Sequence, residues 1–116
     1  MTNDEQLDLI FKALGDTTRR RILSMLAEKE IRITDIAEPF DMSLNAVSKH
    51  LMVLEKAGLV KRTKDGRIHR CKMDPRPLEP ALDLIQYYKS FWENQLDGLE
   101  KFLQQKLAKG DAKNDS

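Results

Sequence analysis

The sequence predicts a mainly helical domain with one small β-hairpin and a long terminal helix. Three observations predict this fold. Apolar residues recur at helical spacing, two short basic segments that read as strands flank an Asp-Gly pair, and residues 78–107 keep a heptad-like apolar pattern. The chain has 116 residues, enough for one compact core. We expect a single domain over residues 1–107 and a polar, disordered tail over residues 108–116.

The first two expected helices meet at residues typical of helix ends. The first helix carries an apolar stripe: Leu7, Ile10, Phe11 and Leu14. Gly15 is placed to stop that helix, and Asp16 to cap the next one. The apolar stripe of the second helix is Ile22, Leu23 and Leu26. Three arginines at 19–21 oppose the helix dipole there, so they either contact something or form a solvated face.

Residues 33–52 fit a helix-turn-helix. Thr34 is placed to cap a short helix through Phe40, and Pro39 removes an amide donor, which predicts a short or bent helix. The small residue Ala37 suits the point where two helices cross, and Asp41 suits the turn.

The second helix of this pair has two distinct sides. Ser43 caps it, Val47, Leu51 and Leu54 face inward, and the helix ends at residues 57–58. The outward side, near the N-terminal end, carries Asn45, Ser48, Lys49 and Met52, with His50 on the flank. The N-terminal part of such a helix is what enters a DNA major groove.

A basic hairpin follows over residues 59–73. Residues 59–64 and 68–73 read as strands, and Asp65-Gly66 is a two-residue turn signal because both residue types tolerate positive φ. A helix-turn-helix followed by such a hairpin predicts a winged helix-turn-helix. Asn, Ser and Lys read base edges or phosphates, and wing cations contact the DNA backbone or minor groove. The predicted DNA-binding residues are Ser43, Asn45, Ser48, Lys49, His50, Arg62, Lys64, Arg67 and His69.

The terminal helix, residues 78–107, offers more apolar surface than so small a domain covers, which favours pairing with a second copy. We expect a homodimer through the region of Leu7, Phe11, Leu82, Ile85, Trp92, Leu96 and Leu99. Folding back onto the chain's own core is the alternative. Trp92, with two tyrosines nearby, serves this dimer core or else an effector pocket.

Net charge and composition limit the possible functions of the chain. Net charge is +1, but residues 16–73 carry +5 between two ends of −2 each, as expected for a protein that binds a polyanion. Neither a membrane span nor a signal peptide is evident, and one cysteine provides no internal disulfide, so we expect a cytoplasmic protein. Cys71 reads as a half-buried strand residue, with a redox role as the alternative.

The segments LGDTTRRRIL and SLNAVSKHLMVLEKAGLVKRTKDGRIHRCKM, with the terminal helix, resemble the ArsR-type (arsenical-repressor-like) transcriptional regulators. The resemblance covers about residues 5–105. It implies a homodimeric repressor of operator DNA, with dimer contacts from the first and last helices. It also implies that Asn45, Ser48, Lys49 and His50 lie in the DNA-contacting stretch.

The chain departs from the metal-sensing members of that family. The segment TDIAEPFDMS contains no cysteine, and residues 78–107 contain no histidine. One Cys and two His do not supply the three or four ligands that zinc or nickel prefers. The chain therefore resembles the non-metal-sensing branch, and we expect no metal or other cofactor.

Two other classes of function are alternatives to DNA binding. A winged helix that binds protein instead of DNA is the main alternative, and a steep fall of binding with salt discriminates it. An enzyme is disfavoured because no nucleophile–base pair, phosphate loop or paired carboxylates stand out.

Overall fold

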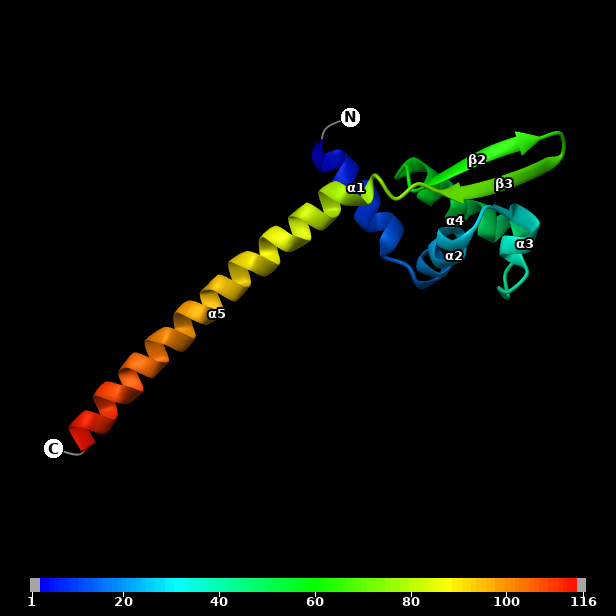
Figure 1. Cartoon of the computed structure of the whole chain (residues 1–116). Coiled ribbons are helices and arrows are strands. Elements are labelled where there is room, and N and C mark those ends of the chain that lie inside the picture. The colour runs from blue at the N-terminus through cyan, green and yellow to red at the C-terminus, as the bar shows by residue number, and fades with distance from the viewer. Residues whose placement is uncertain (1–2, 115–116) are drawn as a thin grey trace. The chain divides into compact units, whose positions relative to one another are not determined.

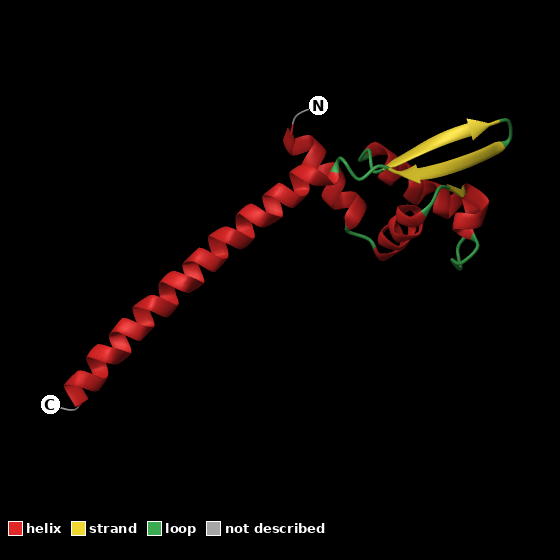
Figure 2. Cartoon of the chain, in the orientation of Figure 1, coloured by secondary structure: helices red, strands yellow, loops and turns green. Residues whose placement is uncertain are grey.

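The computed structural model describes residues 3–114, with side chains described for residues 3–108 (Figure 1). The elements in chain order are α1 (Asn3–Leu14), α2 (Thr17–Glu28), β1 (Ile31–Arg32), α3 (Ile33–Ala37), α4 (Leu44–Lys56), β2 (Val60–Asp65), β3 (Ile68–Met73) and α5 (Leu78–Asn114). Helices dominate and the strands form one small antiparallel sheet, which confirms the predicted fold class (Figure 2). The chain divides into two compact units, Met1–Ala81 and Leu82–Ser116.

The first unit is built around one apolar core. Val47, Leu51 and Leu54 of α4 are fully buried, as predicted. They pack with buried residues from α1, α2, α3, β3 and the start of α5: Ile10, Ala13, Ile22, Leu23, Leu26, Ile36, Cys71 and Ala81. Because α4 supplies one side of this core, its opposite side is left at the surface.

Side-chain caps fix the starts of α2 and α4. The amide of Arg19 donates to Asp16 Oδ2 at 3.0 Å, and the amide of Ala46 donates to Ser43 Oγ at 3.1 Å. Both predicted N-caps are confirmed. α4 ends at Lys56 and Gly58 follows with φ +78°, a conformation that favours glycine.

α3 differs from its prediction at both ends. It begins at Ile33, so Thr34 lies within its first turn and is not its cap, and no side chain caps its start. It ends at Ala37, before Phe40, and the Phe40 amide closes a tight turn on the Ala37 carbonyl at 3.1 Å. Pro39 cannot donate a helical hydrogen bond, so the prediction of a short helix is confirmed.

The wing has three strands, in the order β1-β3-β2, where the sequence predicts two. β1 pairs antiparallel with β3 through Ile31↔Cys71 and Arg32↔Arg70. A strand of two residues is too short to show an alternation of apolar and polar side chains, so the sequence pattern does not predict β1.

The hairpin turn lies one residue further along than predicted. Asp65 is the last residue of β2 and pairs with Ile68, which leaves Gly66 and Arg67 as the two turn residues. Gly66 has φ +63°, and no non-glycine residue in the described part of the chain has positive φ. Positive φ at the first central position alone is the pattern of a type II′ turn.

α5 begins as predicted at Leu78, with Pro80 in its first turn. It continues past Leu107 to Asn114, so residues 108–114 of the expected disordered tail are helical, and residues 115–116 lie outside the described residues. Within a single chain, every described side chain from residue 85 to residue 108 is exposed. No helix in the described part of the chain is long and apolar enough to cross a bilayer.

Candidate nucleic-acid interface

The surface of α4 is polar and cationic along the side opposite the core. Asn45, Lys49, Met52 and Lys56 are exposed at helical steps of four, three and four residues, and Ser48 is half-buried beside them. The burial of Val47 and Leu51 fixes the rotation of the helix, so this stripe faces solvent as a direct consequence of the core packing.

A groove brings α4 and the wing together. Asn45 and Ser48 of α4 and Arg62 and His69 of the wing line it, together with Ile33 and Leu44. Four of the nine predicted DNA-binding residues therefore share one surface depression.

The strand register explains which wing residues face this groove. Lys64 pairs with His69 and Arg62 pairs with Cys71, so these four side chains lie on the same face of the hairpin. Cys71 is buried in the core, so Arg62, Lys64 and His69 point to the side of the hairpin that covers the helices. His69 Nδ1 is shielded from solvent and has no hydrogen-bond partner within the described residues.

Arg62 is held by an internal partner. Its Nε and Nη2 atoms lie 2.9 and 2.7 Å from Glu55 Oε1, and the side chains of Arg62 and Glu55 are 24% and 32% exposed. The ion pair joins β2 to α4. Arg62 thus fixes the wing against the helix, a role that the sequence prediction does not include.

The wing tip carries the cations that remain available. Lys64 and Arg67 are exposed, and no ion pair or side-chain hydrogen bond from either is present within the described residues. Ser43, another predicted contact, is exposed while its hydroxyl caps α4.

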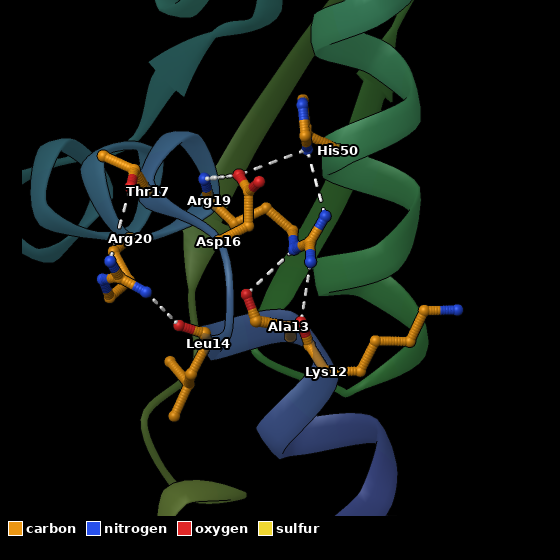
Figure 3. Close-up of polar contacts among 8 residues, drawn as sticks. All are labelled: Lys12, Ala13, Leu14, Asp16, Thr17, Arg19, Arg20 and His50. Carbon is orange, nitrogen blue, oxygen red and sulfur yellow. Dashed lines mark hydrogen bonds and ion pairs between the residues drawn. The ribbon is translucent and has the colours of Figure 1, made fainter.

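His50 belongs to a polar cluster at the junction of α1, α2 and α4 (Figure 3). Arg19 Nη1 lies 3.2 Å from His50 Nδ1, and Asp16 Oδ2 lies 3.8 Å from the same nitrogen. The His50 side chain is 22% exposed, so it is partly enclosed by these neighbours. The amide of Arg19 and, to a smaller degree, the nearby cations hold the pKa of Asp16 below its usual range.

Two of the three arginines at the start of α2 bind the end of α1. Arg19 donates from Nε to the Ala13 carbonyl at 2.9 Å and from Nη2 to the Lys12 carbonyl at 2.7 Å. Arg20 Nη1 donates to the Leu14 carbonyl at 2.7 Å. The last carbonyls of a helix have no partner within it, so these arginines serve as external caps of α1 (Figure 3). This capping role accounts for Arg19 and Arg20 at the start of α2, a position where the helix dipole disfavours cations.

Cys71 is more deeply placed than predicted. Its side chain is fully buried in the core, and burial raises the pKa of its thiol. Within the described residues, no group of three or more His, Cys, Asp or Glu side chains gathers as a metal site.

Comparison with known proteins places this fold and surface in a family. The family described as "Bacterial regulatory protein, arsR family" matches residues 16–62, which include the whole helix-turn-helix. An uncharacterized HTH-type transcriptional regulator, YuzN of Bacillus subtilis, is 42% identical over 83 residues, 65% of this chain and 89% of that protein. The chain belongs to the ArsR family.

A further relative and two solved structures agree with this assignment. The transcriptional repressor SdpR of Bacillus subtilis is 29% identical over 75% of this chain and 97% of its own length. A crystal structure of an ArsR family transcriptional regulator superposes with a TM-score of 0.75, at 34% identity, covering 79% of this chain and 95% of that one. A homodimeric winged helix-turn-helix DNA-binding domain from Mycobacterium bovis superposes with a TM-score of 0.59, at 27% identity, covering 74% and 80% of the two chains.

The sequence-based resemblance is thus confirmed. This ArsR-family chain is a transcriptional regulator with a winged helix-turn-helix DNA-binding domain, and its relatives are regulators, not enzymes.

Proposed function

We propose that this chain is a homodimeric repressor that reads an inverted-repeat operator with α4 and contacts the DNA backbone with the wing. The observation that carries the proposal is the groove in which Asn45 and Ser48 of α4 lie beside Arg62 and His69 of the wing. A helix whose polar N-terminal half is exposed next to a basic hairpin presents one continuous surface to a duplex.

Each exposed residue has a distinct proposed role. Asn45, Ser48 and Lys49 read base edges in the major groove, because amide, hydroxyl and ammonium groups match the donors and acceptors displayed there. Lys64 and Arg67 contact phosphates or the adjacent minor groove, which supplies affinity more than specificity. Ser43 and His69 flank these contacts, and Arg62 and His50 position the wing and α4 through their internal partners.

A dimer is supported by the apolar side chains of α5. Phe11 of α1 is partly exposed, and large apolar side chains of α5 are exposed at heptad-like steps: Leu82, Ile85, Trp92, Leu96, Leu99 and Leu103. The homodimeric Mycobacterium bovis domain supports the same assembly for this chain. Two α4 helices related by a two-fold axis then meet half-sites about 34 Å apart.

We further propose that repression is not controlled by zinc, nickel or a thiophilic metal. Cys71 is buried in the core and His50 is hydrogen-bonded to Arg19, so neither is available as a ligand without rearrangement. Equal operator affinity with added zinc and with chelator supports this, and a change in affinity with zinc contradicts it.

Footprinting of the purified protein on its own upstream region tests the function. We expect protection of an inverted repeat, and gel-shift affinity that falls steeply with salt. Lys49→Ala and Arg67→Ala weaken binding, while Lys29→Ala, at the end of α2 among acidic neighbours, serves as the matched control. Unchanged affinity in both test variants contradicts the assigned surface, and binding without salt dependence favours a protein-interaction module. Lower transcription from the protected promoter distinguishes repression from activation.

A further inference from the structure

We propose that the DNA-binding surface extends along α4 to Lys56 and onto α1 at Lys12, and that these two lysines bind phosphates beside Lys49. This inference rests on the proposed DNA binding. It assigns a phosphate-binding role to two residues outside the nine predicted contacts: Lys56 at the end of α4, and Lys12 on α1, a helix that the sequence prediction assigns to the dimer.

A second groove, distinct from the one beside the wing, carries the inference. It lies between α1 and α4 and is lined by Leu9, Lys12, Lys49, Met52, Val53 and Lys56. Leu9 and Val53 are half-buried at its base, while Met52 is 56% exposed. All three lysine side chains are exposed, and none of the residues that line the groove is acidic.

The three ammonium groups form no ion pair within the described residues, because none of the ion pairs there includes Lys12, Lys49 or Lys56. The groove near β1 differs, because there Lys29, Arg32 and Arg70 are interspersed with Glu30 and Asp35. Cations that gather without a counter-charge repel one another, and an external polyanion relieves that repulsion.

The position of the groove favours DNA as that polyanion. Lys56 lies seven residues after Lys49, so both lie on the exposed stripe of α4 that begins at Asn45. A duplex that contacts Lys49 therefore passes close to Lys56 and to the adjoining end of α1. Phosphates repeat regularly along such a duplex, so they match a row of cations better than one isolated anion does.

Lys12 is held in place for this contact. Its carbonyl accepts a hydrogen bond from Arg19 at 2.7 Å, which fixes the backbone of the last turn of α1. Figure 3 shows the Lys12 side chain leading away from that polar cluster, with its ammonium at the far end. The charged group is thus available while its backbone is anchored.

The test is the salt dependence of binding, measured for the full chain on its footprinted operator and on an unrelated duplex. The variants are Lys12→Gln and Lys56→Gln, the charge-retaining Lys12→Arg and Lys56→Arg, the reference Lys49→Gln, and the control Lys29→Gln. Each phosphate contact contributes about 0.9 to the slope of log K against log salt concentration. In a dimer each Gln substitution removes two contacts, so we expect the slope to fall by about 2 on both duplexes.

The outcomes separate this inference from the proposed function. Lower slopes for the two Gln variants, with wild-type slopes for the Arg variants and for Lys29→Gln, support the extended surface. Wild-type slopes for Lys12→Gln and Lys56→Gln, in a protein whose Lys49→Gln slope falls, overturn the inference and leave the proposed function intact. A wild-type protein that binds neither duplex overturns both. Circular dichroism melts verify that each variant is folded.

Discussion

Arg19 Nη1 lies 3.2 Å from His50 Nδ1, and this contact ties α4 to α2, whose Arg19 also holds the end of α1. The remaining guanidinium nitrogens of Arg19 donate to the Ala13 and Lys12 carbonyls at 2.9 and 2.7 Å. Because a guanidinium only donates, His50 Nδ1 accepts in this hydrogen bond. One side chain thus donates to two of the last carbonyls of α1 and fixes one flank of α4.

His50 is therefore expected to act on DNA binding through position. His50→Ala should weaken operator binding severalfold while leaving the salt slope unchanged, because no phosphate contact is lost. The measurement is the salt dependence of operator binding for His50→Ala, compared with that for Lys49→Ala. A slope that falls in His50→Ala as it does in Lys49→Ala contradicts positioning and supports the direct contact that the sequence predicts.

The same pair is expected to contribute to stability. A double-mutant cycle of Arg19→Ala and His50→Ala, measured by urea unfolding, should give a coupling free energy of about 1 kcal/mol, typical of a hydrogen bond between partly enclosed groups. Additive effects of the two substitutions contradict an energetic link. Arg21→Ala, exposed on the same helix, is the control.

Because of Asp16, the free energy of unfolding should depend on pH in the acid range. The Arg19 amide lowers the pKa of Asp16, so its carboxylate adds stability above the unfolded-state value near 3.9 and loses it as pH falls through the lower folded pKa. Asp16→Asn keeps an N-cap but removes the charge. At pH 7 it should unfold more easily, by less than about 1 kcal/mol because the site is partly solvated.

The difference in the free energy of unfolding between wild type and Asp16→Asn should shrink as the pH falls below the unfolded-state value and the wild-type carboxyl becomes protonated. Urea unfolding at pH 7, 5, 4, 3 and 2 measures it. A difference that stays constant over this range shows that charge has no part in the effect. Asp65→Asn, at the exposed end of β2, controls for general charge effects.

Local signals in the sequence were enough to predict α4 and its surroundings. Ser43 and Asp16 cap helices because each side chain reaches an amide three residues ahead, which is a short-range interaction. The spacing of Val47, Leu51 and Leu54 sets the buried side of α4 and therefore its exposed stripe. The stripe follows from helix geometry, so sequence suffices to find it.

Features that depend on a partner in another helix or strand were not predicted from the sequence. β1 is a strand only because Ile31 pairs with Cys71, forty positions away, and nothing in its own two residues requires it. Arg62 looks like a free wing cation until Glu55 is brought beside it. The turn between α1 and α2 brings Arg19 and Arg20 to the last carbonyls of α1. The spacing of apolar residues does not predict the geometry of that turn.

Cys71 should be unreactive in the folded protein. It is fully buried, and burial raises the pKa of its thiol, so little thiolate is present and reagent has no access. A thiol-reactive dye should label it only at the rate of unfolding, and mild oxidant should leave operator affinity unchanged. Rapid labelling of native protein, or loss of DNA binding on oxidation that reductant restores, contradicts this prediction.

A charge on the apolar side of α5 should separate the dimer. Leu96 is 46% exposed and Trp92 63% exposed in one chain, and both lie on the heptad-like row that a second copy is proposed to cover. Leu96→Glu places two unpaired carboxylates in that contact, and removing them from water is costly. Sedimentation equilibrium should therefore report a monomer for Leu96→Glu and a dimer for wild type.

Ser90→Glu is the matched control, because Ser90 lies on the polar side of the same helix and a dimer through the apolar side leaves it in solvent. Loss of the dimer should also reduce operator affinity by two orders of magnitude or more, roughly the avidity of two linked half-sites, while binding to unrelated DNA falls less. The core of the first unit contains no residue beyond Ala81, so its thermal unfolding should be preserved in Leu96→Glu. A variant that still sediments as a dimer shows that another surface joins the subunits.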